Sequence, residues 1–310
     1  MATINTAKAQ GVQAVTALID AFHQRLAAST QSLASSRCLS HADLFALVLQ
    51  ARDACDSPVL RRYSGIRLIE LLQDAAVVQP IPLTPAPAKK TVRLYAIGSN
   101  PIATIPPAEL LQAHVPSGIL CYFTAIDLHA LSTQPAPHHH IARTAAPKQK
   151  TAPSQETPSS DSPLPLGVAE FLVEGVTCYL TRRDSSNLLG TQRRRLNPYC
   201  VATVTTLEQT LLDCLHRPHS CGGPSVVFEA WETGLKRTTT EKLLALARRI
   251  GDSTLLRRAG YMIEHYGSDT TALPEMKRLT EDFFAADTTP TLLPGIPYEH
   301  IDATWGLRTP

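Results

Sequence analysis

Apolar residues near the N-terminus recur every three or four positions, which predicts a helix with one buried face. That face comprises Val12, Val15, Leu18, Ile19, Phe22 and Leu26. A second, shorter helix is predicted over LFALVLQA, because Ser40 and Asp43 form an S-x-x-D capping signal just before it. Ser57 followed by Pro58 has the character of an N-cap and a first turn, so it predicts a third helix that runs to about Asp74.

Two extended segments follow these helices. VVQPIPL and TVRLYAI both predict strands, with the proline-rich TPAPAKK turning between them. The second strand alternates Val92, Leu94 and Ala96 with more polar neighbours, which is typical of a strand buried on one face. Three helices followed by a two-stranded ribbon is the order of a winged helix, which we predict for residues 1–97.

The remaining residues, 98–310, predict a mixed and mainly helical domain. FLVEGVTCYL predicts a pair of strands, and TLEQTLLDCLH, EKLLALARRI, STLLRRAGYMIEHY and PEMKRLTEDFF predict helices. Gly251 and Gly267 stand where two of these helices should end. Residues 143–166 contain five prolines and no apolar periodicity, which predicts a disordered or extended insert. The predicted fold class is therefore α+β, with a winged helix-turn-helix domain before this second domain.

Length and composition indicate a globular protein with more than one core. The 310 residues, 44% of them hydrophobic, suffice for two modest domains. The N-terminus lacks a basic region followed by an apolar run, and the apolar stretch GILCYFTAI is far too short to span a bilayer. The seven cysteines are scattered without a CxxC pair, which favours reduced thiols over a disulfide framework. We expect a cytoplasmic protein with no membrane partner.

The net charge of +2 conceals an asymmetry along the chain. Residues 1–97 contain ten Lys and Arg against six Asp and Glu, a net charge of +4, which leaves −2 for the rest. Six of the ten lie between Arg61 and Arg93, where the acidic residues are Glu70 and Asp74. This polarity is expected of a segment that contacts phosphates, although an ordinary solvated surface would also explain it.

A helical wheel of the third predicted helix separates a core face from an outer face. Leucine and isoleucine at positions 68, 69, 71 and 72 surround the buried direction, whereas Tyr63 and Arg67 point away from it. Arg62 lies on the flank, and Arg61 lies on the core side but could reach outward from the first turn. A recognition helix would use these side chains on base edges or phosphates, and the wing would contact the backbone; a plain solvent-facing helix is the alternative. The predicted DNA-binding residues are Arg61, Arg62, Tyr63, Arg67, Lys89, Lys90 and Arg93.

Cys214, His216, His219 and Cys221 raise the question of a zinc site. Cys214 and His216 are two residues apart, which corresponds to about 200° of rotation around a helix, so their side chains point to nearly opposite sides. Cys214 belongs to a buried stripe, His216 faces outward, and Pro218 ends the helix. The spacing also lacks the C-x₂₋₄-C and H-x₃₋₅-H forms of zinc-binding loops. We predict a helix end here and no metal.

Other candidate chemistry is equally sparse. In the run HHH at 138–140, consecutive side chains of a strand would point to opposite faces and could not converge on one ion. The sequence has no G-x-S-x-G elbow, no glycine-rich phosphate loop and no H-E-x-x-H. Asp213 and His216 could hydrogen-bond, but an exposed surface pair is the commoner arrangement. We predict neither an enzyme nor a cofactor.

Several blocks of the second domain resemble a known family. LLDCLHRPHSCGGPSVVFEAW resembles the Leu-Asp-x-Leu-x-Arg-Pro-x-x-x-Gly-Gly segment of abortive infection antitoxins of the AbiE type. GILCYFTAIDLHALSTQPAP, VTTLEQTLLD, RRAGYMIEHYG and TLLPGIPYEHIDATWGLRTP resemble further blocks of that family. The resemblance covers most of residues 118–310 and, more loosely, the predicted N-terminal winged helix. Two departures stand out: Gln209 replaces the usual Arg, and the proline-rich insert interrupts a region expected to be continuous.

The resemblance implies a two-domain antitoxin that is also a transcriptional regulator. Its winged helix would bind inverted repeats in operator DNA near its own promoter and repress its own operon. Its second domain would counteract a neighbouring nucleotidyltransferase-like toxin, and such antitoxins usually act without a stable complex with the toxin. An orphan DNA-binding regulator without antitoxin activity and a zinc-binding interaction module are the alternatives.

Basic residues of the second domain are the candidates for an antitoxin face. They could contact a nucleotide, an RNA or an acidic partner surface, or they could be solvated side chains with partners inside the molecule. Glu208 and Asp213 are expected to be structural, one near a helix N-terminus and the other as a surface or capping group. The predicted antitoxin face comprises Arg193, Arg194, Arg195, Arg248, Arg249, Arg257 and Arg258.

Overall fold

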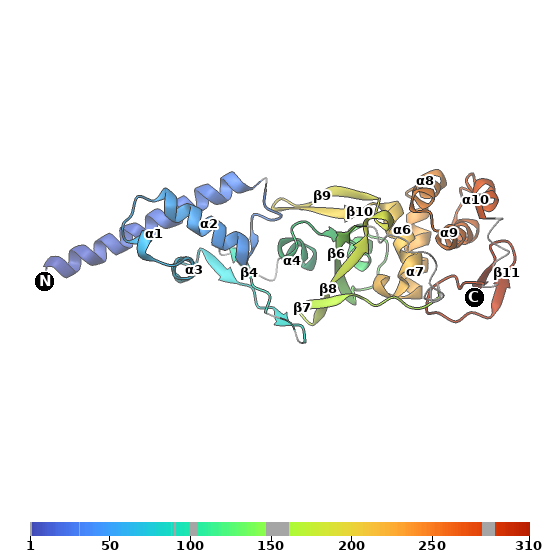
Figure 1. Ribbon diagram of the computed structural model, residues 1–310, viewed down its shortest axis with the longest axis horizontal. Coiled ribbons are helices and arrows are strands. Elements are labelled where there is room, and N and C mark those ends of the chain that lie inside the picture. Colours follow the sequence, from blue (N-terminus) through green and yellow to red (C-terminus); the bar gives the residue numbers. More distant parts are fainter. Residues whose placement is uncertain are drawn as a thin grey trace. The chain divides into compact units, whose positions relative to one another are not determined.

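The computed structural model is a mixed α and β protein that divides into two compact units (Figure 1). It describes residues 2–30, 32–87, 89, 91–98, 105–146, 161–280 and 289–310. The first unit comprises Met1–Pro116, Phe171–Val173 and Arg194–Ala202. The second comprises Ser117–Glu170, Glu174–Arg193 and Thr203–Pro310. The first unit thus extends beyond residue 97, where the sequence placed the boundary.

Helices α1 (Ala2–Ser29), α2 (His41–Ala54) and α3 (Gly65–Asp74) build the first unit with a small sheet. Its strands are β1 (Cys38–Ser40), β2 (Val78–Pro80) and β4 (Leu94–Ile97), in the order β1-β4-β2 with both pairs antiparallel. The predicted capping of α2 is confirmed, since the Ser40 side chain accepts a hydrogen bond from the Asp43 amide at 3.1 Å. The core includes Leu18, Phe22, Leu44, Leu47, Val48, Leu60, Leu68, Leu72 and Val78.

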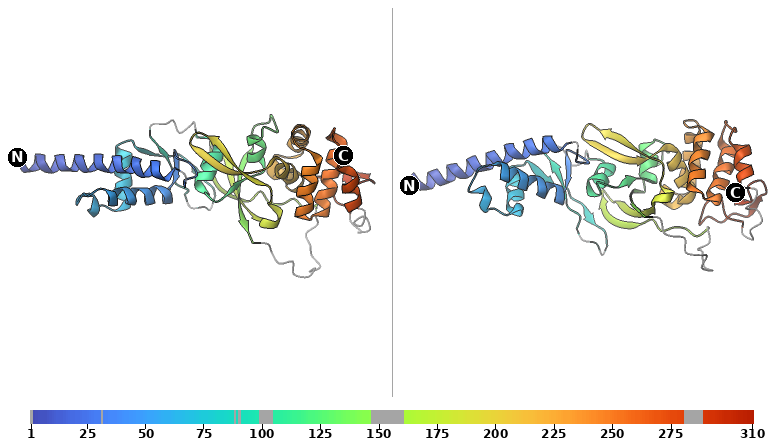
Figure 2. Two further views of the ribbon diagram at one scale, coloured as in Figure 1. Left: turned by 90° about the horizontal axis from the view of Figure 1, so that it is seen from above. Right: turned by 45° about the horizontal axis from the view of Figure 1, so that its top comes forward.

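The buried face of α1 is shorter than its apolar pattern predicts. Leu18 and Phe22 are fully buried, whereas Val12 is 64% exposed. Figure 2 shows that the first turns of α1 run past the other helices of this unit.

The third predicted helix is broken, because it does not run from Ser57 to Asp74 in one piece. A 3₁₀ turn, η1 (Leu60–Arg62), is followed by Tyr63 in an extended conformation. The Ser64 side chain then caps α3 by accepting from the Arg67 amide at 3.3 Å. Gly65 packs so closely on the Phe45 ring that an added Cβ would lie 2.3 Å from it. The start of α3 is therefore fixed by a side-chain cap and a tertiary contact, and Tyr63 does not belong to this helix.

The predicted ribbon also differs in detail. All four residues of β4 are buried, whereas the sequence predicted that buried and exposed positions would alternate. The strand is buried throughout because α2 and α4 (Pro107–His114) both pack against it. The third strand of the sheet, β1, was not predicted. The short β3 (Thr84–Pro85) pairs with Phe171 and Leu172 instead of extending β2.

Glu109 on α4 explains why the first unit takes in residues far apart in sequence. Its fully buried carboxylate accepts from the Ser35 hydroxyl at 2.5 Å, from Arg37 Nη2 at 2.7 Å and from Asn197 Nδ2 at 2.8 Å. Charge-assisted hydrogen bonds of this kind are stronger than neutral ones. They join α4 and the segment 194–202 to the loop before β1.

The main sheet has the strand order β3-β7-β8-β6-β5-β10-β9. Its strands after β3 are β5 (Ile119–Leu120), β6 (His138–Ala145), β7 (Val168–Val173), β8 (Val176–Asp184), β9 (Thr191–Asn197) and β10 (Cys200–Thr205). The predicted strand pair is confirmed as β7 and β8, joined by Glu174 and Gly175, both at positive φ. Strand β6 runs parallel to β8, with His138 opposite Thr177.

The predicted insert at 143–166 is narrower than expected at both ends. Residues 143–145 belong to β6 and pair with β8. Asp161 is anchored, since its Oδ1 accepts from the Thr291 amide at 2.7 Å and its Oδ2 from Arg308 at 2.5 Å. The predicted disorder concerns mainly residues 147–160, which lie outside the described residues.

Helices complete the second unit. They are α5 (Phe123–Leu128), α6 (Leu207–His216), α7 (Pro224–Leu235), α8 (Thr240–Ile250), α9 (Ser253–Tyr266) and α10 (Leu273–Thr280), with 3₁₀ turns η3 (Ser185–Asn187) and η4 (Pro218–Cys221) and a ribbon of β11 (His300–Asp302) and β12 (Leu307–Thr309). Gly251 and Gly267 are the C-caps of α8 and α9, as predicted. The core includes Leu211, Leu215, Trp231, Leu243, Met262 and Trp305. Of the helices described, none combines the length and apolar character needed to cross a membrane.

Candidate functional site

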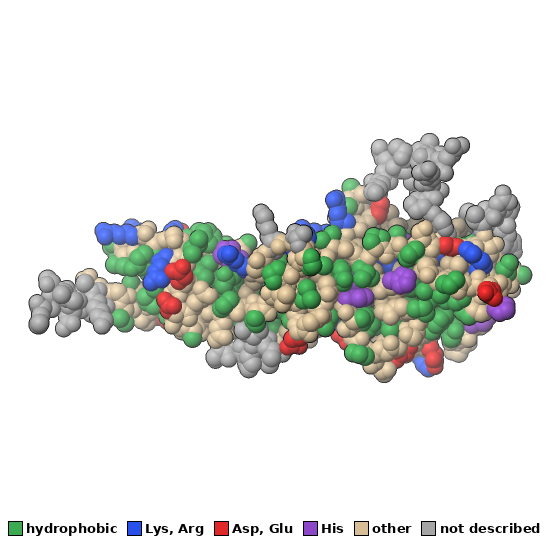
Figure 3. Space-filling model, turned by 90° about the horizontal axis from the view of Figure 1, so that it is seen from below, with side chains coloured by type: hydrophobic (Ala, Val, Ile, Leu, Met, Phe, Trp, Pro, Cys, Tyr) green, Lys and Arg blue, Asp and Glu red, His purple; other side chains and the backbone are tan. Residues whose placement is uncertain are grey.

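Helix α3 presents an exposed face that combines basic and apolar side chains. Arg67 is exposed and pairs with Glu70 at 2.8 Å along the helix. Ile66, which the sequence analysis did not single out, is 62% exposed beside it. Ile66 is an apolar residue in the first turn of α3 that lies outside the buried stripe of this helix. The sequence reveals its exposure only when the start of the helix is placed correctly. On the face of the molecule seen in Figure 3, Lys and Arg side chains lie over the helices of this unit.

The other predicted DNA-binding residues have different surroundings. Arg61 and Arg62 lie in the 3₁₀ turn before α3 and are exposed, and Arg61 pairs with Asp56 at 2.9 Å. Tyr63 is half-buried against the core, so the prediction that it points directly away from the core is wrong. Lys89 and Arg93 are exposed, and Lys90 lies outside the described residues.

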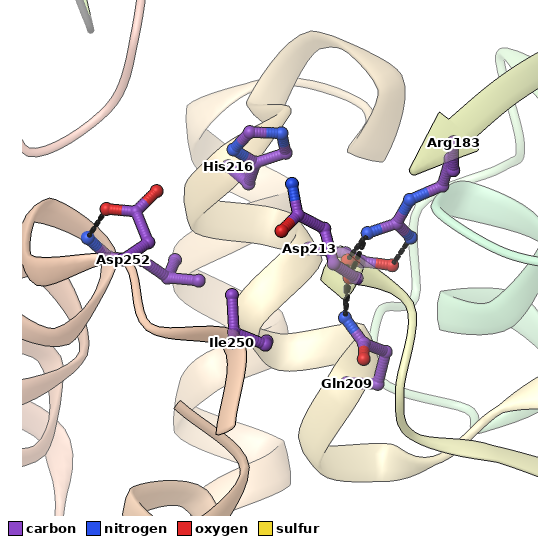
Figure 4. Close-up of a pocket in the computed structure, with 8 residues that line it drawn as sticks. Arg183, Gln209, Asp213, His216, Ile250 and Asp252 are labelled. Atoms are coloured by element: carbon purple, nitrogen blue, oxygen red, sulfur yellow. Dashed lines mark hydrogen bonds and ion pairs between the residues drawn. The ribbon is translucent and has the colours of Figure 1, made fainter. Parts of the chain in front are cut away.

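A buried ion pair links β8 and α6 in the second unit (Figure 4). Asp213 accepts hydrogen bonds from Arg183 Nη1 at 2.6 Å and Nη2 at 2.7 Å, and both side chains are almost completely buried. Burial by itself lowers the pKa of Arg183, but attraction to Asp213 outweighs it, so this pKa is raised. The expectation of a surface role for Asp213, including an exposed pair with His216, is therefore wrong.

Gln209 belongs to the same network and shows why glutamine fits this position. Its Oε1 accepts from the backbone amides of Leu189 and Gly190 at 3.1 and 3.0 Å, and its Nε2 donates to Asp213 Oδ1 at 2.9 Å. An arginine here could not accept hydrogen bonds from the two amides, and it would place a second guanidinium beside Arg183. The glutamine is thus matched to its local partners.

A small polar pocket opens beside this network. Its space of about 10 Å³ is enough for roughly one water molecule. The pKa of His216 is lowered to about 4, chiefly by burial and further by the charge of Arg183, so its imidazole is neutral at pH 7. Both oxygens of Asp213 are engaged, which leaves it poorly placed to act as a base. The lining residues are Arg183, Asn187, Gln209, Asp213, His216, Ile250, Asp252 and Leu255.

Two of the arginines predicted for an antitoxin face are internal. Arg257 is 6% exposed and donates to the carbonyls of Trp305, at 2.6 Å, and Gly306. Arg258 is 3% exposed and donates to the Thr291 carbonyl at 2.9 Å. The prediction fails for both because carbonyls distant in sequence satisfy their guanidinium groups, which hold the C-terminal segment on α9.

The other predicted arginines remain partly or fully exposed. Arg193 and Arg195 project from β9 into solvent, and Arg194 between them is half-buried. On α8, Arg248 pairs with Glu275 at 3.5 Å, whereas Arg249 lines a pocket together with Lys242. Lys242 was missed, although its spacing of seven residues from Arg249 places both on one side of the helix.

The histidine run and the cysteines lie as the sequence predicts. His138 Nδ1 and His140 Nε2 are 2.9 Å apart on one face of β6, whereas His139 approaches Thr124. Cys214 is fully buried in the core, and all seven cysteines are free and buried. Within the ranges that the structure describes, no group of three or more His, Cys, Asp or Glu side chains is placed to hold a metal ion.

No family model matches the chain, and no curated protein matches it in sequence. Among solved structures, the chain is similar to the crystal structure of RV2827C protein from Mycobacterium tuberculosis. That similarity has a TM-score of 0.48 and 16% sequence identity, and it covers 93% of this chain and 91% of the other.

Proposed function

We propose that the protein is a winged-helix repressor of its own operon and an antitoxin against a neighbouring nucleotidyltransferase-like toxin. The observation that carries the DNA-binding part is the order α1, β1, α2, α3, β2, β4 with the antiparallel sheet β1-β4-β2. In a winged helix, the helix before the ribbon enters the major groove and the ribbon contacts the backbone. Here these elements are α3 and the segment between β2 and β4.

The exposed side chains of this unit support that orientation. Arg62, Arg67, Lys89 and Arg93 are all exposed and carry positive charge toward solvent. The Arg67–Glu70 pair lies on the surface, where ion pairs add little stability, so a phosphate or base edge could replace Glu70 at little cost. Ile66 adds an apolar contact of the kind that meets a thymine methyl group.

The antitoxin part rests on the sequence blocks of the second unit. These blocks fall on structural elements of one compact body: α6 and η4, α9, and the C-terminal segment that Arg257 and Arg258 hold in place. Surface cations remain available on this body at Arg193, Lys242 and Arg249. A toxin or its nucleic-acid substrate would meet these side chains and not the internal arginines.

The two roles can be separated in one experiment. The neighbouring toxin gene is expressed with the full-length protein or with the double variant Arg62→Ala and Arg67→Ala, and colony survival and promoter repression are measured together. We expect the variant to lose repression and to keep rescue, because its substitutions lie on the exposed surface of the first unit. Failure of the wild-type protein to rescue from a proven toxin would exclude the antitoxin role, and repression by the variant would exclude the α3 assignment.

A further inference from the structure

A pocket of about 370 Å³ lies where the start of β9, the N-terminus of α6 and one side of α8 meet. All its lining residues belong to the second unit, and α6 and α8 are neighbours there (Figure 1). Pockets of this size bind small molecules of nucleotide scale. The lining residues are Leu189, Gly190, Thr191, Thr206, Glu208, Lys242, Ala245, Leu246 and Arg249.

The pocket has two cations that are not paired within the described part of the chain. Lys242 and Arg249 are exposed on the same side of α8, and neither forms an ion pair with a described carboxylate. Arg248, the neighbour of Arg249, differs because it pairs with Glu275 at 3.5 Å. Cations that line one pocket without an ion-pair partner are suited to a phosphate group.

One carboxylate, that of Glu208, lines the pocket. Glu208 accepts a hydrogen bond from the Thr238 hydroxyl at 2.6 Å. Burial acts to raise the pKa of Glu208, but this bond and the charge of Lys242 lower it overall, so the carboxylate is ionised at pH 7. Two positive charges therefore face one negative charge, and the N-terminus of α6 adds positive potential.

The rest of the lining is apolar or closely packed backbone. Leu189, Ala245 and Leu246 offer an apolar surface, and Thr191 offers a hydroxyl group. Gly190 forms a tight wall, because a Cβ there would lie 2.7 Å from Thr206 Oγ1. Apolar walls with a few polar groups are typical of small-molecule sites.

We propose that this pocket binds a small organic phosphate of the nucleotide class. Lys242 and Arg249 hold the phosphate group, and the organic part lies against Leu189, Ala245 and Leu246. This inference goes beyond the proposed function and does not depend on it, because the site involves neither α3 nor the wing. The second unit would bind this ligand whichever partner protein it has.

The test is isothermal titration calorimetry of the full-length protein with ATP, inorganic phosphate, adenosine and a short single-stranded RNA without terminal phosphates. We expect ATP to bind, and Lys242→Ala and Arg249→Ala each to weaken it about tenfold, as expected for loss of one charge-assisted hydrogen bond. Ala245→Phe should also abolish binding by filling the pocket without changing its charge. The matched control, Arg248→Ala, removes an exposed neighbouring charge outside this pocket and should leave the affinity unchanged.

Several results would overturn the proposal. The proposal is wrong if ATP does not bind at millimolar concentration, or if the RNA is the only ligand that binds. It is also wrong if adenosine binds as tightly as ATP, or if all three pocket variants bind ATP as the wild-type protein does. Circular dichroism of each variant checks its fold. Because the substituted side chains are exposed, we expect folding to be unaffected.

Discussion

Arg183 on β8 and Asp213 on α6 form a bidentate ion pair at 2.6 and 2.7 Å with both side chains almost fully buried. Thirty residues separate them along the chain, so the pair fixes helix α6 on the sheet. Gln209 extends the network to the backbone at Leu189 and Gly190, which are also part of the proposed phosphate pocket. The interior of the second unit and its candidate ligand site thus depend on the same few hydrogen bonds.

Removal of one partner of this pair should be costly. Asp213→Asn leaves the Arg183 guanidinium buried without a countercharge, and we expect it to lower the free energy of unfolding by about 3–5 kcal/mol. Urea denaturation followed by circular dichroism measures the change. Glu275→Gln, which removes a carboxylate from surface pairs with Arg248 and Arg278, should cost far less. Equal effects of the two substitutions would contradict the account.

Gln209→Arg should destabilise the protein. The substitution leaves two backbone amides without their acceptor and adds a buried positive charge, so we expect a loss of at least about 2 kcal/mol. Thermal unfolding compares it with Gln192→Arg, which makes the same change at an exposed position of β9. A Gln209→Arg protein as stable as the control would show that the network can rearrange.

Tyr122→Phe should be neutral or stabilising. The hydroxyl group of Tyr122 is buried, and its oxygen has no hydrogen-bond partner among the residues that the structure describes. Loss of an unsatisfied buried polar group relieves its desolvation cost, so we expect a gain of up to about 1 kcal/mol. Tyr95→Phe is the comparison, because the Tyr95 hydroxyl lies 3.3 Å from His41 Nδ1. A loss above about 1 kcal/mol for Tyr122→Phe would indicate a partner for this hydroxyl.

Acid should destabilise the second unit through His216. Its pKa of about 4 in the folded protein is below the ordinary value of 6.5, so the unfolded chain binds the proton more readily between these values. Stability is therefore lost as the pH falls from about 6.5 to 4. The groups that face His216 electrostatically are Arg183, Asp213, Arg217 and Asp252. His216→Gln should reduce the slope of unfolding free energy against pH by up to about 1.4 kcal/mol per unit in this window. An unchanged slope would contradict the assignment.

Local signals in the sequence predicted much of the fold. The Ser40 cap of α2, the Gly251 C-cap and the strand pair around Gly175 each depend on residues within a few positions of one another. The break before α3 was missed, because the sequence predicted Ser57 as the cap in place of Ser64, and because the packing of Gly65 against Phe45 involves a residue twenty positions earlier. Strand β1 was missed as well, since its three residues carry too short a pattern to be recognised.

The candidate sites were harder to predict for the same reason. Arginine is normally exposed, so sequence alone favoured a surface position for Arg257 and Arg258. Their carbonyl partners lie about 30–50 residues further along the chain, in a segment with no periodic pattern. Lys242 and Arg249 could have been paired by their helical spacing, but the pocket they line also needs β9 and α6.

The central claim is that α3 and the turn before it bind DNA, and the salt dependence of promoter binding tests it most directly. The dissociation constant of the full-length protein for its own promoter fragment is measured over a range of KCl concentrations. We expect Arg62→Ala and Arg67→Ala to weaken binding. The slope of log K against log salt concentration should become flatter by about one for each phosphate contact that a substitution removes. Arg25→Ala, which removes an exposed charge from α1, should leave both unchanged. If affinity and slope stay the same in the α3 variants, helix α3 is not the DNA-binding element.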